Sequence, residues 1–425
     1  MIRLSGADLI LPDRVVGGGT LLLDDDRIAD IIVSPAPQGA SSDALDFPLA
    51  DHYIVPGFID VHVHGVEGID TLDGGDAIAR MAERLPRFGV TAFCPTSIAC
   101  DPATLRRLLS GVRAARTTRP PGGSRVLPAH LESNFINPEY KGAQPLECLR
   151  APGSNRGQTG VKPGSDRGQT GVRPGSDPSI GRDGGSWTGD DILEEIAAAR
   201  PDVGIVTVAP EIDDAIDLIR DLVSHGHHVS LGHSGATYDQ AMEGVRAGAR
   251  QATHLFNRMT PVTHRAPGLA GAMLESDDVI AELVCDGVHV HPAMMRVALA
   301  AKRPDRIMAI TDGTAGSGLP KGSKATLGGR AISVRDAAYL DDGTIAGSVL
   351  TMDRAFAKLT SEIGLSLSDA ATLCATTPAR ALGLQHFGVI ARGAIADLVV
   401  LDRDLRVVQT WVAGTLAWER QPTKG

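Results

Sequence analysis

Residues 56–65 read PGFIDVHVHG and give the first indication of the fold. A short apolar run, typical of a buried strand, ends here in two histidines that stand two residues apart. Alternate residues of a strand point to the same face, so both imidazoles can reach one spot. Because imidazole is the commonest metal ligand in proteins, His62 and His64 are candidate metal ligands at the end of a strand.

Seven further apolar runs follow, alternating with helical stretches. The runs end near Cys94, Glu132, Ala209, His233, His254, Cys285 and Asp312. Amphipathic helices are expected between several of them, over residues 104–115, 190–199, 212–225 and 239–247. Strands that alternate with helices indicate a parallel sheet, and eight such units over about 330 residues predict an α/β fold with a TIM-like (β/α)8 barrel.

Both ends of the chain carry short apolar runs separated by Gly and Asp, a pattern typical of small antiparallel sheets. These runs are residues 9–11, 15–16 and 21–23 at the start, and 396–402 and 407–413 at the end. We therefore expect one small β-sandwich domain built from residues 1–54 and 386–425, with the barrel over residues 55–385.

A tandem repeat interrupts the barrel pattern at residues 153–189. GSNRGQTGVKP at 153–163 is followed by GSDRGQTGVRP at 164–174, and a third copy begins at Gly175. A segment so rich in Gly, Pro, Ser and Gln cannot bury enough apolar surface to offset the entropy of ordering it. It is predicted to be a mobile surface insertion.

The composition excludes several classes of protein. The 425 residues are 43% hydrophobic and 22% charged, as in globular proteins, and no apolar run is long enough for a transmembrane helix. A net charge of −10 and an aromatic content of 4% argue against nucleic-acid binding. Five scattered cysteines and the lack of a secretory signal favour reduced thiols and a cytoplasmic location.

Imidazole and carboxylate groups gather where the predicted strands end. They belong to His62, His64, Glu132, His233, His254 and Asp312. In a (β/α)8 barrel the carboxyl ends of the strands converge on one mouth, where the chemistry takes place. Each histidine alone could equally be structural, but six such residues at five strand ends favour a divalent metal site with an open position for water.

These motifs resemble those of the amidohydrolase superfamily, and within it the sugar-phosphate deacetylases. The resemblance spans the chain outside the insertion and is carried by PGFIDVHVHG at 56–65, HLE at 130–132, GHSGAT at 232–237, THLFNRM at 253–259, HRAPG at 264–268, DGVHV at 286–290, ITDGT at 310–314, GSVLTM at 347–352 and GAIADLVVLD at 393–402. It implies a metal-dependent amide hydrolase that converts N-acetylglucosamine 6-phosphate into glucosamine 6-phosphate and acetate, in amino-sugar metabolism. It also implies a homodimer, in which barrel loops of one subunit reach the pocket of its partner.

The resemblance further implies a role for individual residues. Glu132, His233 and His254 would hold a principal ion, and His62 and His64 a second one, with zinc as the expected metal and iron as the alternative. Asp312 would be the catalytic acid and base. Contacts with the phosphorylated N-acetylated amino sugar are implied for Gln144, Asn257, Arg258, Arg265, His289, Ile345, Ala346 and Gly347.

Two departures from the family pattern leave the substrate open. Ser133 and Asn134 follow Glu132 where the family has Gly-Pro, and Gln144 replaces a histidine that contacts substrate. The galactosamine epimer is therefore an alternative substrate. A dihydroorotase-like cyclic amidohydrolase is disfavoured because residues 203–211 contain no lysine to be carboxylated. An inactive metal-binding scaffold is disfavoured by Asp312 and the complete ligand set.

Overall fold

The middle of the chain forms the predicted barrel. A computed structural model describes residues 1–33, 45–153 and 187–421. The parallel strands follow one another around the barrel in the order β6 (Phe58–Val63), β9 (Val90–Ser97), β11 (Ala129–Leu131), β12 (Val203–Val208), β13 (His228–Leu231), β14 (Gln251–Ala252), β15 (Ile280–Val284) and β16 (Ile307–Ile310), with β10 (Arg125–Val126) also beside β9. A bridge between Val63 and Gly313 returns the last strand to the first. The (β/α)8 prediction is confirmed.

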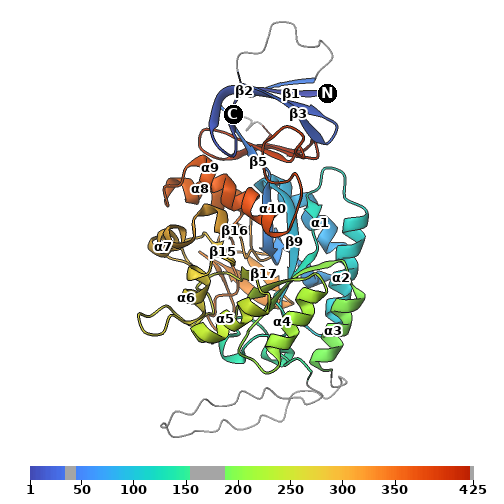
Figure 1. Ribbon diagram of the computed structural model, residues 1–425. Helices are drawn as coiled ribbons and strands as arrows, with labels where there is room; N and C mark the ends of the chain where they lie inside the picture. The colour runs from blue at the N-terminus through green and yellow to red at the C-terminus, as the bar shows by residue number, and fades with distance from the viewer. Residues whose placement is uncertain (34–44, 154–186, 422–425) are drawn as a thin grey trace.

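Helices surround these strands (Figure 1). They are α1 (Ala77–Arg84), α2 (Pro102–Thr117), α3 (Gly189–Ala198), α4 (Ala215–Ser224), α5 (Tyr238–Ala247), α6 (Gly268–Glu275), α7 (Pro292–Lys302), α8 (Met352–Ser361), α9 (Leu367–Ala371) and α10 (Thr377–Ala381). Helix α2 begins at Pro102, before the expected residue 104, because the Asp101 side chain caps it and Pro102 occupies its first turn. Helix α4 begins later than residue 212, since Asp214 adopts a φ of +60° and ends the preceding turn.

Strands from both ends of the chain share a second sheet, which stands above the barrel in Figure 1. Its order is β22 (Thr415–Glu419), β21 (Val407–Val412), β20 (Leu398–Leu401), β5 (Tyr53–Pro56), β1 (Ile2–Ile10), β2 (Val15–Asp24) and β3 (Arg27–Ile32), with β4 (Leu45–Pro48) beside β1. Leu21, Ile54 and Trp411 are buried in its shared core, as expected for one domain made from both termini. Most neighbouring strands pair antiparallel as expected, including β5 with β20, but β4 and β5 pair parallel to β1.

Two small sheets near the barrel mouth have no counterpart in the predictions. They are β7 (Gly65–Val66) with β8 (Ile69–Asp70), and β17 (Lys324–Leu327) with β18 (Arg330–Val334) and β19 (Ala338–Tyr339). Most of the predicted insertion, residues 154–186, lies outside the described residues, and α3 already begins at Gly189.

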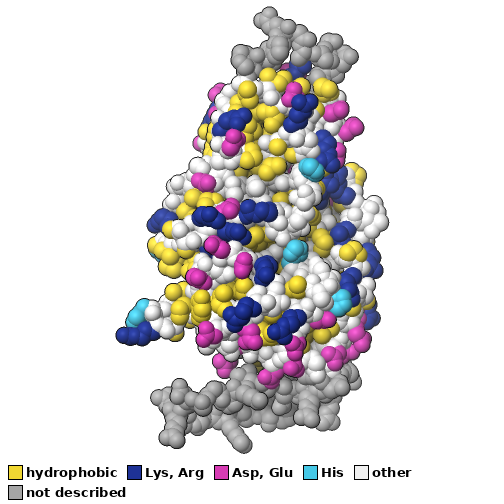
Figure 2. All heavy atoms as spheres, viewed as in Figure 1, with side chains coloured by type: hydrophobic (Ala, Val, Ile, Leu, Met, Phe, Trp, Pro, Cys, Tyr) yellow, Lys and Arg dark blue, Asp and Glu magenta, His cyan; other side chains and the backbone are white. Residues whose placement is uncertain are grey.

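Two further features concern the length of the helices and the distribution of charge on the surface. Within the described ranges, no helix combines the length and apolar character needed to cross a bilayer. On the face shown in Figure 2, basic and acidic side chains are interspersed over the barrel and the terminal sheet. That face therefore presents no continuous basic area to a polyanion.

Candidate metal centre

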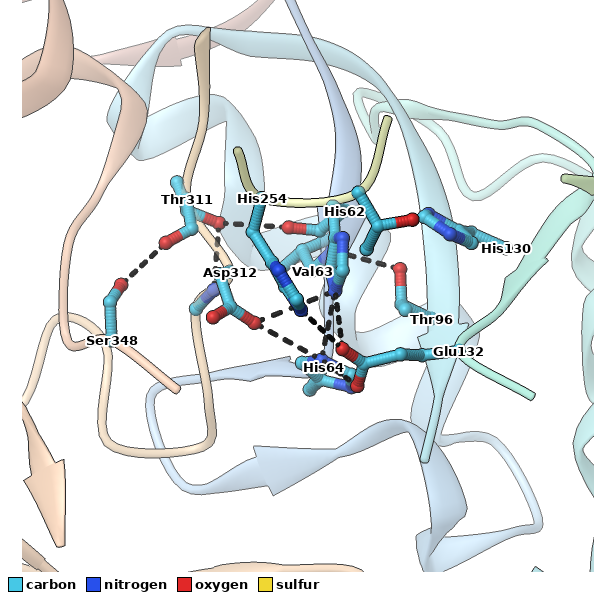
Figure 3. A network of polar contacts seen from close by, with 12 residues as sticks. His62, Val63, His64, Thr96, His130, Glu132, His254, Thr311, Asp312 and Ser348 are labelled. Carbon is cyan, nitrogen blue, oxygen red and sulfur yellow. Dashed lines mark hydrogen bonds and ion pairs between the residues drawn. The ribbon is translucent and has the colours of Figure 1, made fainter. Parts of the chain in front are cut away.

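The barrel strands bring the predicted ligands to one place, and Figure 3 shows His62, His64, Glu132, His254 and Asp312 pointing toward each other. Glu132 follows β11, and His62 lies within β6. His233, His254 and Asp312 follow β13, β14 and β16 in left-handed backbone, with φ of +46°, +32° and +49°. Such strained non-glycine conformations cluster at functional sites, and here they occur where the chain leaves each strand for the mouth.

One group of ligands surrounds Oε1 of Glu132. The Nε2 atoms of His233 and His254 lie 2.7 and 2.8 Å from this oxygen, and 3.0 Å from each other. Nδ1 of His233 donates to the carbonyl oxygen of Tyr140 at 2.8 Å, which leaves the lone pair on Nε2. These three side chains form a group that could hold a metal ion.

A second group lies on the other side of Glu132. The Nε2 atoms of His62 and His64 are 3.2 Å apart, and Nε2 of His64 lies 3.6 Å from Oε2 of Glu132 and 3.2 Å from Oδ1 of Asp312. Asp312 is held from both sides, because its backbone N donates to His62 O and its carbonyl accepts from Ser348 N. Glu132 therefore stands between two sets of imidazoles.

The donor set fits divalent ions. Bonds of 2.0–2.1 Å in tetrahedral geometry place neighbouring ligand atoms about 3.3 Å apart, close to the 3.0 and 3.2 Å between the paired imidazole nitrogens. The Nδ1 atoms of His64 and His254 are buried with no hydrogen-bond partner, so both rings interact through Nε2. Lone pairs that face each other this closely repel unless a cation or a proton separates them.

Burial and neighbouring charges shift the pKa values of these groups in different directions, and contact with Glu132 raises the pKa of His254 to about 9 despite its burial. Burial lowers the pKa of His62 to about 3, so its imidazole is neutral. Burial alone would raise the pKa of Glu132, but the charges and hydrogen bonds of His233 and His254 hold it well below its usual value. The pKa of Asp312 is likewise lowered, because contact with His64 outweighs the effect of burial. Both carboxylates are therefore ionised at neutral pH.

Glu282 on β15 and His130 on β11 complete the buried network, and Glu282 was not predicted from the sequence. Oε2 of Glu282 lies 2.9 Å from Nδ1 of His62. His62, His130 and Glu282 also lie close enough together to hold a metal ion. Both ring nitrogens of His130, however, already contact protein atoms, Val61 O and Thr207 Oγ1, at 3.0 Å each. The sequence feature that could have identified Glu282 is its place as a carboxylate within the apolar run of residues 279–285, because a buried charge needs a partner.

The mouth opens into a cavity of about 420 Å³ beside the two groups. The predicted substrate residues that line it are Gln144, Asn257, Arg258, His289, Ile345 and Gly347. Arg258 is the only Arg or Lys among the described residues of its wall. Tyr140, Phe256, Met259 and Leu327 also line it and were not predicted.

Two residues that were predicted to contact the substrate do not line this cavity. Ala346 is fully buried in an apolar cluster with Ile332 and Ala338, because its backbone pairs with Ala338 and turns the methyl group away from the cavity. Arg265 is exposed on the loop of residues 261–266, outside the cavity wall of its own chain.

A parallel barrel whose mouth gathers imidazoles and carboxylates around a cavity defines a metal-dependent hydrolase. The amidohydrolase family model matches residues 53–417, and the chain belongs to this family, as its motifs suggested. It is 30% identical to the N-acetylglucosamine-6-phosphate deacetylase of Bacillus subtilis (strain 168), over 96% of this chain and 95% of the relative.

Two further comparisons bear on the substrate. The N-acetylgalactosamine-6-phosphate deacetylase of Escherichia coli O157:H7 is 32% identical over 93% of this chain and 95% of its own length. The solved structure of a Mycobacterium smegmatis N-acetyl-D-glucosamine-6-phosphate deacetylase mutant, in complex with N-acetyl-D-glucosamine-6-phosphate, superposes with a TM-score of 0.82. It is 31% identical and covers 98% of this chain and 99% of its own.

Proposed function

We propose that the chain hydrolyses the acetamide of N-acetylglucosamine 6-phosphate, giving glucosamine 6-phosphate and acetate in amino-sugar metabolism. The observation that carries this proposal is the convergence of Glu132, His233 and His254 with Asp312 at one cavity. Relatives that match nearly the whole chain bear the name of this activity. A dihydroorotase-like reaction gains no support, because β12 carries no lysine.

The residues divide the work of the reaction. Glu132, His233 and His254 would hold one ion, and His62 and His64, with Glu132, a second. A bound divalent ion lowers the pKa of water toward neutrality and polarises the acetyl carbonyl. Asp312, ionised and beside His64, would orient the attacking water, accept its proton and return that proton to the departing amine nitrogen.

The cavity wall supplies the contacts for the sugar. Asn257 and His289 would bind hydroxyl groups, and His289 is oriented by a 2.6 Å contact between its Nδ1 and Oδ2 of Asp286. The backbone around Arg258 and the guanidinium of Arg265 would meet the phosphate, since a planar fork of donors suits that group. Ile345 and Gly347 would shape the wall beside Asp312.

We further propose that the metal is zinc and that the enzyme is a cytoplasmic homodimer. Nitrogen and carboxylate ligands suit zinc, with iron as the alternative. The five cysteines form no disulfide, as suits a reducing compartment. In a homodimer, the exposed loop that carries Arg265 would reach the cavity of the partner subunit.

Acetate release from the two epimeric sugar phosphates tests the substrate. We expect faster turnover of N-acetylglucosamine 6-phosphate than of N-acetylgalactosamine 6-phosphate, measured as kcat/KM with each. Faster turnover of the galactosamine epimer would reassign the substrate. Bound metal without acetate release from either compound would favour the scaffold.

A further inference from the structure

Glu282 connects the two ligand groups through a single oxygen atom. It lies on β15, has no solvent exposure and does not line the cavity. Its Oε2 lies 2.9 Å from Nδ1 of His62 and accepts from the backbone N of His254 at 3.2 Å. One carboxylate oxygen therefore contacts one ligand from each side of Glu132.

The contact with His62 fixes which ring nitrogen carries the proton. With Glu282 in its carboxylate form, Oε2 can only accept, so Nδ1 of His62 donates to it as the backbone N of His254 does. A neutral imidazole protonated on Nδ1 has its lone pair on Nε2. That atom faces Nε2 of His64 at 3.2 Å, so the ring is held in the form that binds an ion there.

The contact with His254 fixes a strained turn. His254 has a φ of +32°, which a non-glycine residue holds only when its surroundings impose it. Glu282 supplies two restraints, because its side chain accepts from His254 N and its carbonyl oxygen accepts from Leu255 N at 2.8 Å. This turn aims Nε2 of His254 at Oε1 of Glu132.

A purely stabilising role explains Glu282 poorly. Its Oε1 is buried with no hydrogen-bond partner, and Nδ1 of His130 lies 3.7 Å away. A buried carboxylate with an unsatisfied oxygen destabilises a core relative to an apolar side chain of similar size. We therefore attribute the presence of this carboxylate to the orientation that it gives to His62 and His254.

We propose that Glu282 is a positioning residue that couples the two ion subsites, fixing the ring of His62 for one and the backbone of His254 for the other. This inference rests on the proposed metal-dependent function. It makes both subsites depend on one side chain outside the ligand set, so that the loss of this side chain weakens both.

Glu282→Leu and Glu282→Gln separate this role from packing. Glu282→Leu removes the acceptor, and we expect the affinity for zinc to fall about 10–100-fold, with the Nδ1 proton of His62 lost from ¹⁵N-histidine spectra of the zinc-free protein. Glu282→Gln keeps an acceptor oxygen in the same shape, so it should retain that proton and most of the affinity. Zinc binding is measured by competition with a chromophoric chelator.

Asp202→Leu is the matched control. Asp202 is a buried carboxylate that pairs with Arg113 and Arg116 away from the mouth, so its loss should lower the melting temperature and leave zinc affinity and the His62 spectrum unchanged. Unchanged zinc affinity in Glu282→Leu would overturn the proposal. So would a wild-type spectrum with the His62 proton on Nε2, which needs no variant to fold. If the proposed function were wrong, the result would be distinct, because the wild type would bind zinc normally and release no acetate.

Discussion

Gln144 donates a hydrogen bond from Nε2 to Oε2 of Glu132, and its Oε1 accepts one from the backbone N of Ala99 at 2.7 Å. The Ala99 amide can only donate, so it fixes the orientation of the Gln144 amide group. The residue that replaces a family histidine therefore has a partner at each polar atom, and one partner is a proposed metal ligand. A contact between Gln144 and substrate stays a prediction.

Gln144→Leu distinguishes the two roles of this side chain. Loss of the hydrogen bond to Glu132 should lower kcat about tenfold, the effect expected for disturbing a group that orients a metal ligand, with little change in KM. Steady-state kinetics with N-acetylglucosamine 6-phosphate measure both constants. A raised KM with an unchanged kcat would instead indicate that Gln144 binds substrate.

Asp312→Asn should remove the proton carrier while preserving the shape of the mouth. We expect kcat to fall about 10²–10⁴-fold, the usual contribution of general acid–base catalysis. The amount of bound zinc, measured by elemental analysis, should stay close to that of the wild type. A variant with near-normal turnover would show that Asp312 carries no proton in the reaction.

Mixing two inactive variants tests whether Arg265 serves the partner subunit. Arg265→Ala should lose activity toward the phosphorylated substrate, and Asp312→Asn loses it by the argument above. In a hybrid dimer, the subunit with intact Asp312 receives Arg265 from its partner, so random mixing should restore about a quarter of wild-type activity. Unfolding and refolding the two variants together, followed by an acetate assay, measures this. The absence of any recovery would place Arg265 outside the partner's site.

Much of the metal centre could be predicted from the positions at which the barrel strands end. His62 and His64 were predictable because the two-residue spacing on a strand fixes their common face, and the ends of parallel strands meet at one mouth. Ala346 and Arg265 were harder to place, since both lie in irregular segments whose direction depends on tertiary contacts. Glu282 was missed because a single carboxylate in an apolar run has no periodic signature.

The loop after Glu132 shows how local hydrogen bonds can replace a family motif. Asn134 donates from Nδ2 to the carbonyl oxygens of Cys100 and Cys148 at 2.8 and 2.7 Å, and Ser133 donates to Thr207 O. These contacts hold the turn where the family uses Gly-Pro. The sequence showed the departure, and only the structure shows the compensation.

Lys302 gives the protein a pH-dependent stability. It ends α7 almost fully buried, with Nζ donating to Ser276 O at 2.6 Å, and burial lowers its pKa to about 8 from 10.5. Between these values the unfolded chain binds more protons than the folded one, so stability rises with pH. The free energy of unfolding of the wild type should therefore increase relative to that of Lys302→Met between pH 8 and 10, measured by urea titration. A constant difference between the two would contradict this.

Acetate release by chelator-treated enzyme, before and after zinc is restored, tests most directly whether the mouth of the barrel holds an ion that the reaction needs. We expect turnover of N-acetylglucosamine 6-phosphate to stop when the protein is freed of metal and to return when zinc rebinds. Full turnover by metal-free protein would contradict this expectation.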